Sequence, residues 1–212
     1  MAELLSNKLD DFMNETHVLP KHDIINMYNQ WTTTYEKEVG ENYEAPNRLA
    51  ESVCRHVHNK KASFLDVGAG TGLFAEALLK AGFNGHFDGL DPATGFAAKA
   101  KERKLYYNFY HEFITEEPCS IPTETYDNIA VCGAIVPGHI HYNAIVELLR
   151  MIKKGGHIFI AMREEYTKTK FSGMDEFLAD LENAGKCKVV ERSTYTNHYI
   201  HYNGLLLVIQ KY

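Results

Sequence analysis

The sequence contains only four cysteines in 212 residues, and no two of them form a C-x-x-C pair. Scattered thiols of this kind exclude a disulfide-stabilised secreted scaffold and are typical of a reducing compartment. No run of about 18 apolar residues occurs, so no segment is predicted to span a bilayer. The first residues also lack the pattern of a secretory signal. We therefore expect a soluble, cytoplasmic protein that has no membrane partner.

An excess of positive charge is also lacking, because 22 lysines and arginines face 28 aspartates and glutamates, a formal net charge of -6. A protein that mainly grips a phosphate backbone carries a basic surface, so no nucleic-acid partner is expected. Metal-ligand clusters are sparse too. The pairs His56 with His58 and His139 with His141 have no carboxylate or cysteine cluster to complete a ligand set, and we predict no metal site.

What the sequence does contain is enough apolar material, 45% of the chain, for one domain with a full core. The first sixty residues predict mostly helices. One helix is expected over 23–39 behind a capping Asp23, and a second helix is expected to begin at Pro46. We expect residues 1–60 to form a helical cover that belongs to the same domain as a core over residues 61–212.

Within that core, short apolar segments alternate with amphipathic ones. Strands are predicted over 63–67, 86–90, 106–113, 127–133 and 157–162, and helices over 73–81, 95–103, 140–152 and 174–184. This alternation is typical of an α/β, doubly wound, mostly parallel sheet. The last two strands, 186–194 and 205–211, are joined by a connector too short for a crossover helix. They predict an antiparallel C-terminal hairpin that completes a seven-stranded, Rossmann-like sheet.

The first core strand runs into a glycine cluster, "FLDVGAGTGLF", directly before a helix. Glycines at such a junction let a ligand approach the backbone at the helix N-terminus. The spacing Gly68-x-Gly70-x-Gly72 differs from the G-x-G-x-x-G of dinucleotide-binding folds, which disfavours a nicotinamide-dependent oxidoreductase. No lysine follows in the manner of a P-loop. Asp66, just before the loop, would repel phosphates but can anchor a ligand amino group.

An acidic residue ends the second core strand, in "HFDGLDPATG". A carboxylate at that point can accept hydrogen bonds from both ribose hydroxyls of a nucleotide. The alternative role of Asp91 is to cap the helix that follows Pro92. The combined spacing of Asp66, the glycines and Asp91 is more specific than any one of these elements.

On these residues the sequence resembles the class I S-adenosylmethionine-dependent methyltransferases, whose first motif is similar to "LDVGAGTG" and whose second strand ends in an acidic residue. The expected C-terminal hairpin is typical of the same family. A narrower resemblance is to the methyltransferase-like protein 27 group. It rests on "MYNQWTTTYEKEV", "APNRLA", "VCGAI" and "HYNAIVELLRMIKKGGHIFIAMR". The resemblance implies S-adenosyl-L-methionine as the cofactor.

The resemblance also implies which positions hold that cofactor. The methionine part would contact the loop after the first strand, at Asp66, Gly68, Ala69, Gly70 and Gly72. The ribose and adenine would contact Asp91, Pro92 and Ala93, and the second face of the adenine would contact Glu112, Phe113 and Ile114, where the Asp-Ala pair common in the family is not present. Cys132, Gly133 and Ala134 would lie under the sulfonium. Aromatic faces attract a positively charged sulfur, and Tyr28, Trp31 and Tyr35 would supply them or else pack against the core.

The methyl acceptor is less constrained by the sequence. No N-P-P-Y or D-P-P-Y follows the fourth strand, which argues against methylation of adenine or glutamine amino groups. His139 is the first candidate for a general base, and His141, Tyr142 and Arg163 stand where family members build the acceptor pocket. We expect a methyltransferase that acts on an unidentified small molecule or protein side chain. The alternative from another class is a non-catalytic S-adenosylmethionine-binding module that acts through a partner.

Overall fold

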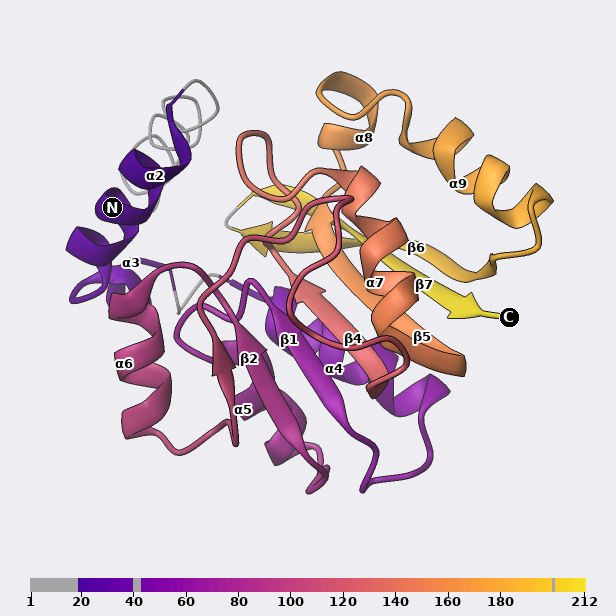
Figure 1. The fold of residues 1–212 in the computed structure, drawn as a ribbon. Helices are drawn as coiled ribbons and strands as arrows, with labels where there is room; N and C mark the ends of the chain where they lie inside the picture. Colours follow the sequence, from indigo (N-terminus) through magenta and orange to yellow (C-terminus); the bar gives the residue numbers. More distant parts are fainter. Residues whose placement is uncertain (1–18, 40–42, 200) are drawn as a thin grey trace.

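The computed structural model describes residues 19–39, 43–199 and 201–212, and its centre is a seven-stranded sheet in the order β3-β2-β1-β4-β5-β7-β6 (Figure 1). The strands are β1 Phe64–Val67, β2 Phe87–Leu90, β3 Phe109–Tyr110, β4 Tyr126–Cys132, β5 Ile152–Arg163, β6 Cys187–Tyr199 and β7 Tyr202–Lys211. β1 to β5 pair in parallel, whereas β7 runs antiparallel to both β5 and β6. The predicted fold class is therefore confirmed.

Helices cover both faces of this sheet, which is why every residue of β1 is buried. On one face, Phe64 and Phe159 pack with Leu49 of α4 (Ala45–His56) and with Leu78 of α5 (Leu73–Lys80). On the other face, Leu65 belongs to a second apolar cluster, to which three further helices contribute. These are α7 (Ile145–Met151), which follows a short 3-10 turn η2 (Tyr142–Ala144), α8 (Tyr166–Thr169) and α9 (Met174–Asn183).

The N-terminal helix differs from the expected one. It is divided into α2 (Lys21–Trp31) and α3 (Tyr35–Val39), and it begins behind Pro20 rather than Asp23. The break falls on three consecutive β-branched threonines, which disfavour a helix. Thr32 also turns its hydroxyl back to donate to the Tyr28 carbonyl at 2.9 Å. The part of the expected N-terminal cover that falls on residues 1–18 lies outside the described residues.

Two side-chain contacts hold α2 against α6 (Thr94–Glu102). The Asn29 side-chain oxygen accepts from the Gly95 amide at 2.8 Å, and the Lys99 ammonium donates to the Thr32 carbonyl. A Cβ at Gly95 would lie 2.7 Å from the Thr32 hydroxyl, so a larger residue would push the two helices apart. α2 is thereby fixed over the carboxyl ends of β1 and β2.

β3 is much shorter than the strand expected over 106–113. The Asn108 amide donates to the side-chain carboxylate of Asp88 on β2, at 2.9 Å, instead of to a backbone carbonyl of that strand. Tyr106 also turns inward, toward β1, so the aromatic run does not keep a strand's alternation. The C-terminal hairpin is longer than expected, because the tyrosine-rich connector itself pairs as part of β6. Among the described residues, no helix combines the length and the apolar content that crossing a membrane requires.

Candidate functional site

The three loop glycines have positive φ angles of 67°, 54° and 92°, a conformation that favours glycine. They differ in what a side chain would meet. A Cβ at Gly68 would lie 2.3 Å from the Ala134 Cβ, and a Cβ at Gly72 would lie 2.3 Å from a Leu105 methyl group. A Cβ at Gly70 would meet nothing within 4 Å. Gly68 and Gly72 therefore allow close packing, whereas Gly70 leaves its backbone open to a ligand.

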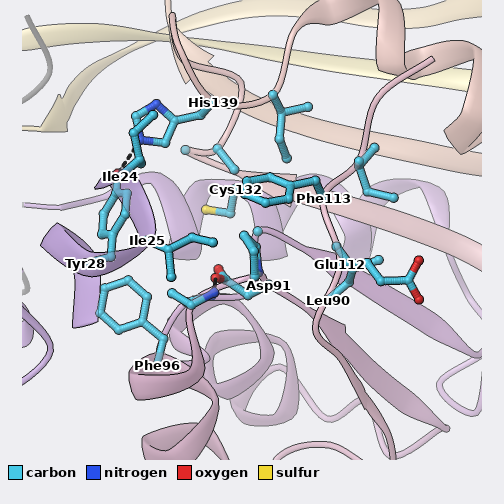
Figure 2. Close-up of a pocket in the computed structure, with 18 of the residues that line it drawn as sticks. Ile24, Ile25, Tyr28, Leu90, Asp91, Phe96, Glu112, Phe113, Cys132 and His139 are labelled. Atoms are coloured by element: carbon cyan, nitrogen blue, oxygen red, sulfur yellow. Dashed lines mark hydrogen bonds between the residues drawn. The ribbon is translucent and has the colours of Figure 1, made fainter. Parts of the chain in front are cut away.

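Gly70 faces a cavity at the carboxyl ends of β1, β2 and β4, roofed by α2 (Figure 2). It holds about 850 Å³ of empty space, open solvent included. Most of the predicted cofactor residues line it: Tyr28, Tyr35, Gly68, Gly70, Asp91, Pro92, Ala93, Glu112, Phe113, Ile114, Cys132, Gly133 and Ala134, together with His139. Residues that lie far apart in the sequence are thus brought together.

A smaller adjoining cavity contains Asp66 together with Ala69, and it shares Gly68, Gly70 and Cys132 with the first cavity. Asp66 is 1% exposed, and its Oδ2 accepts from the Tyr106 hydroxyl at 2.7 Å. Its Oδ1 is buried without a hydrogen-bond partner, as is the Thr71 hydroxyl in the same cavity. Burial raises the pKa of Asp66 to about 7, and the Tyr106 hydrogen bond opposes that shift. An unsatisfied acidic oxygen therefore faces a cavity.

Asp91 is 8% exposed and joins two backbone segments. Its Oδ2 accepts from the Gly70 amide at 2.9 Å, and its Oδ1 accepts from the Ala93 amide at 2.8 Å. Burial raises the pKa of Asp91, and these two hydrogen bonds lower it. Ala93 precedes the first turn of α6, so Asp91 ties the glycine loop to the start of that helix rather than capping the helix itself.

We expect Asp91→Ala to lower the free energy of unfolding of the ligand-free protein by about 1–3 kcal/mol, because the Gly70 and Ala93 amides lose their acceptor. Denaturant unfolding measures this loss. Asp91→Asn keeps one acceptor oxygen, so its free energy of unfolding should lie between those of the native chain and of Asp91→Ala. An unchanged free energy of unfolding in Asp91→Ala would show that these hydrogen bonds do not hold the loop.

His139 closes the top of the main cavity by contacting α2. Its Nδ1 lies 3.1 Å from the Pro137 carbonyl, which can only accept, so Nδ1 carries the proton. Burial lowers the pKa of His139, and the neutral Nε2 accepts from the Tyr28 hydroxyl at 2.9 Å (Figure 2). The candidate base is thus inside the site, with its lone pair directed at Tyr28.

Trp31 and Gly72 line neither cavity, although the sequence predicts both at the site. The Trp31 indole donates to Glu38 at 2.8 Å, and its ring lies 5.0 Å from the Tyr35 ring, centroid to centroid. Sequence reasoning missed Ile24, Ile25, Tyr43, Leu90, Phe96, Gly138 and Ile140 in the main cavity. The only sign of Tyr43 in the sequence is the glycine at position 133, which the close approach of Tyr43 requires. A Cβ at Gly133 would lie 2.0 Å from the Tyr43 hydroxyl.

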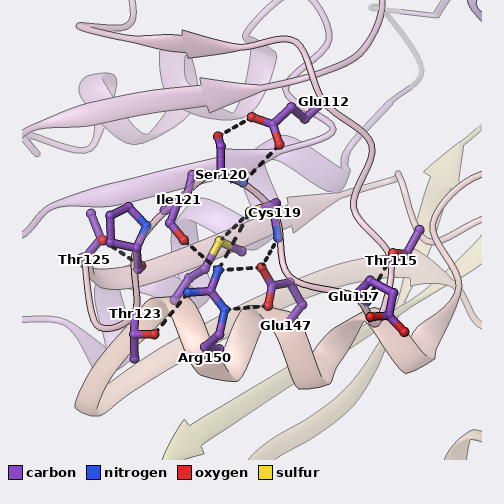
Figure 3. Close-up of polar contacts among 12 residues, drawn as sticks. Glu112, Thr115, Glu117, Cys119, Ser120, Ile121, Thr123, Thr125, Glu147 and Arg150 are labelled. Carbon is purple, nitrogen blue, oxygen red and sulfur yellow. Dashed lines mark hydrogen bonds and ion pairs between the residues drawn. The ribbon is translucent and has the colours of Figure 1, made fainter.

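The loop that follows β3 is held in place by α7 (Figure 3). The Glu112 carboxylate accepts from the amide and hydroxyl of Ser120. The Cys119 amide donates to Glu147 at 2.8 Å, and Arg150 donates to both oxygens of Glu147 and, at 2.6 Å, to the Ile121 carbonyl. The main-chain segment that carries Glu112 to Ile114 is therefore fixed, while the Glu112 carboxylate itself is engaged by Ser120.

Among residues 19–39, 43–199 and 201–212, no group of three or more His, Cys, Asp or Glu side chains is arranged to hold a metal ion. The His-x-His pairs contact other side chains instead. His56 Nε2 lies 2.8 Å from Glu191, and the His141 ring packs 4.1 Å from the Tyr142 ring, centroid to centroid.

The sheet order, the glycine loop and the acidic residues of β1 and directly after β2 are arranged as in the Rossmann-like fold of class I S-adenosylmethionine-dependent methyltransferases. Residues 64–156 match the family model described as Methyltransferase domain. It is similar to Methyltransferase-like protein 27 of Homo sapiens, with 28% identity over 165 residues. That match covers 76% of this chain and 66% of the human protein, just under two thirds.

Solved structures share the fold at low sequence identity. A chain from the Haloferax volcanii complex between the Trm112 methyltransferase activator and a protein named as a methyltransferase superposes with a TM-score of 0.67 at 15% identity, covering 87% of this chain and 97% of that one. A protein named as a SAM-dependent methyltransferase from Aquifex aeolicus gives 0.56 at 19% identity, covering 84% and 97%. The [4+2]-cyclase SpnF gives 0.57 at 16% identity, covering 78% and 81%.

Proposed function

We propose that this chain binds S-adenosylmethionine across the two adjoining cavities and transfers its methyl group to an acceptor. The observation that carries this proposal is the buried, unpartnered Oδ1 of Asp66 beside the open backbone of Gly70. An ammonium group is the partner such a carboxylate oxygen lacks, and a phosphate would be repelled by it. The cofactor carries an ammonium and no phosphate, whereas nicotinamide dinucleotides carry a pyrophosphate.

The remaining residues of the main cavity fit the same ligand. Each oxygen of Asp91 accepts one backbone hydrogen bond and keeps a second lone pair, which suits the ribose hydroxyls. Phe96 and Phe113 line the main cavity and supply apolar surface for the adenine. Tyr28, Tyr35 and Tyr43 surround the end of β4, where aromatic faces favour a positively charged sulfur.

S-adenosylmethionine would supply a methyl group on a positively charged sulfur, which becomes a neutral thioether as the acceptor's lone pair takes the methyl group and the acceptor loses its proton. The chain then has mainly to align the acceptor and exclude water. α2 provides the cover, closed at Tyr28 and His139. Because the Nε2 of His139 accepts from Tyr28, His139 takes up the acceptor's proton through the Tyr28 hydroxyl or after that hydroxyl turns away.

The first test selects among nucleotides. A ligand that binds only the folded state stabilises it by RT ln(1 + [L]/Kd), about 2.7 kcal/mol at a hundredfold excess over Kd, which is a shift in Tm on the order of 5–10 °C for this size. We expect S-adenosylmethionine and its demethylated product S-adenosylhomocysteine to raise the Tm, and NAD and ATP to leave it unchanged. A shift with NAD alone would overturn the cofactor assignment.

Binding and transfer have to be measured separately, since the same fold occurs in a protein named as a cyclase. The chain is incubated with methyl-labelled S-adenosylmethionine and a cell extract, and label is sought in small molecules and in proteins. Cofactor binding without any labelled product would favour the alternative, a non-catalytic binding module that acts through a partner. One similar structure comes from a complex with the Trm112 activator, so the extract is used with its proteins present as well as removed.

A further inference from the structure

A second chamber adjoins the cofactor cavity and shares part of its lining, namely Tyr28, Tyr35, Tyr43 and Gly133. The chamber holds about 540 Å³ of empty space, open solvent included. Its far wall comes from the end of β5 and from the tip of the β6–β7 hairpin, where His198 lines it. An acceptor placed here would meet the methyl group at the end of β4.

A bulge near the end of β6 turns two neighbouring side chains into this chamber. The pairing of β6 with β7 shifts register between Tyr195 and Tyr199, and Asn197 within this stretch has a φ of 60°. Asparagine tolerates this left-handed conformation better than most residues. In a regular strand His198 and Tyr199 would point to opposite faces, yet both are buried and both line the chamber. The bulge thus aims His198 at the site, as bulges beside active sites often do.

The Tyr195 hydroxyl orients the His198 ring, because it lies 2.6 Å from Nδ1. Gly204, the partner of Tyr195 on β7, makes room for the tyrosine ring, since a Cβ at Gly204 would lie 2.1 Å from a carbon of that ring. Burial raises the pKa of Tyr195, so its hydroxyl keeps its proton at neutral pH. If Nδ1 were the donor, that proton would have no acceptor among the described residues. Tyr195 therefore donates to Nδ1, and Nε2 of His198 carries the proton of the ring.

The Nε2–H of His198 is left for a ligand. Within the part of the chain that the structure describes, no acceptor lies within hydrogen-bond distance of it, and the ring lines the chamber. Burial lowers the pKa of His198 to about 3, and the charge of Arg163 adds to that effect, so the ring is uncharged at physiological pH. Arg163 lies in the same wall, where Glu165 at 3.4 Å and the Tyr202 ring at 3.9 Å engage its guanidinium. The wall therefore offers a ligand an uncharged hydrogen-bond donor.

We infer that the methyl acceptor is a flat, uncharged small molecule whose oxygen, such as that of a carbonyl, accepts a hydrogen bond from Nε2 of His198. A buried donor without an acceptor is costly, so an oxygen at that point gains both affinity and specificity. Tyrosine walls favour a planar body, and burying an ion beside them costs more than burying a neutral dipole. The inference rests on the proposed methyl transfer, and it selects such a molecule over an organic ion or a protein side chain.

The test titrates matched phenols into the chain saturated with S-adenosylhomocysteine. The ketone para-hydroxyacetophenone carries a carbonyl oxygen and para-ethylphenol lacks it, whereas para-hydroxybenzoate and tyramine carry a negative and a positive charge instead. We expect the ketone to bind most tightly. Its advantage over para-ethylphenol should shrink about tenfold in His198→Phe, which keeps a ring of similar size and removes the donor. His201→Phe, at the exposed turn of the same hairpin, is the matched control and should leave the ratio of the two Kd values unchanged.

NMR of the imidazole nitrogens distinguishes a positioning role of His198 from a merely structural one. In the native chain Nε2 should carry the proton and Nδ1 should not, and addition of the ketone should shift the Nε2 resonance. Tyr195→Phe removes the donor that fixes this tautomer. We expect that variant to retain S-adenosylhomocysteine binding and to lose part of the preference for the ketone.

The inference is overturned if the preference for the ketone survives in His198→Phe, if para-hydroxybenzoate or tyramine binds more tightly than the ketone, or if none of these phenols binds. A proton on Nδ1 instead of Nε2 would contradict it as well. Failure of the proposed function looks different, because S-adenosylhomocysteine then does not bind. If His198→Phe itself does not fold, the comparison of the phenols in the native chain and in Tyr195→Phe still decides.

Discussion

Asp66→Asn is expected to weaken S-adenosylhomocysteine binding about 10- to 100-fold, because one charge-assisted hydrogen bond to the ligand's ammonium is worth about 1.5–3 kcal/mol. The amide keeps the size of the side chain, so the ligand-free fold should survive. Calorimetric titration measures the effect. Asp180→Asn, on the exposed face of α9, is the matched control and should leave Kd unchanged.

The same residue sets a pH dependence. The pKa of Asp66 lies near 7 in the ligand-free protein, and an ammonium binds the ionised form. Affinity should therefore fall about tenfold per pH unit below 7 and level off above it, a dependence that Asp66→Asn removes. Tyr106→Phe deletes the hydroxyl that lowers the pKa of Asp66, so the midpoint should move to higher pH. An affinity of the native chain that stays constant from about pH 5.5 to about pH 8, instead of falling about tenfold per unit below 7, would contradict this role of Asp66.

The stability of the ligand-free fold changes with pH in the opposite direction to the affinity for the ligand. A carboxyl whose pKa is raised by folding stabilises the fold fully below its unfolded value, 3.8, and loses that contribution as the pH rises through about 7. The ligand-free native chain should thus lose stability relative to Asp66→Asn between these values. Ligand binding should reverse the loss. This compensation is typical of a binding site that keeps an unsatisfied group for its ligand.

Glu147→Ala is expected to lower the free energy of unfolding by about 3–5 kcal/mol, the usual cost of breaking a buried ion pair from one side. Glu147 is 2% exposed, and its loss removes the carboxylate that accepts from Arg150 and from the Cys119 amide, while Arg150 keeps its hydrogen bond to the Ile121 carbonyl (Figure 3). Burial would raise the pKa of Glu147, but its donors hold that pKa below the usual value. The stabilisation should therefore be present at neutral pH and lost as the pH falls through that lowered pKa.

Glu51→Ala is the matched control, because Glu51 also pairs with an arginine three residues away on a helix, at 3.3 Å. Both partners there are exposed, so we expect a loss of at most about 1 kcal/mol. Denaturant unfolding of the two variants gives the comparison. Equal losses would show that Glu147 does not anchor the loop after β3. The loop also carries Glu112 to Ile114, so Glu147→Ala should weaken cofactor binding as well.

The sequence predicts the sheet well, because its signals are local. Apolar runs buried on both faces, glycines at the first strand–helix junction and a connector too short for a helix each report their own structure. It fails over 106–113, where the aromatic pattern resembles a strand but Asp88 and Asp66 take up the polar groups. It fails again at the three threonines that end α2. Over 106–113 the deciding partners lie far away in the sequence, whereas the break at the threonines has a local cause that the apolar periodicity of the helix hides.

The residues of the candidate site also divide into those that the sequence predicts and those that it does not. Asp66, Gly70 and Asp91 are readable because each stands at the end of a strand, where parallel strands meet. Tyr43 and Phe96 are not, because their place at the cavity depends on how α2, α4 and α6 pack. Trp31 shows the converse: its spacing suits the site equally well, yet its indole donates to Glu38 and its ring packs beside Tyr35. A periodic pattern fixes a helix face but not what that face meets.

The most direct test of the central claim is a crystal structure of the chain with S-adenosylhomocysteine. We predict the amino group within hydrogen-bond distance of Asp66 Oδ1, the ribose hydroxyls on Asp91 and the thioether sulfur at the end of β4, beside Cys132 and Gly133. A ligand bound elsewhere, or one that leaves Asp66 Oδ1 without a partner, would contradict the account, whatever the activity assays report.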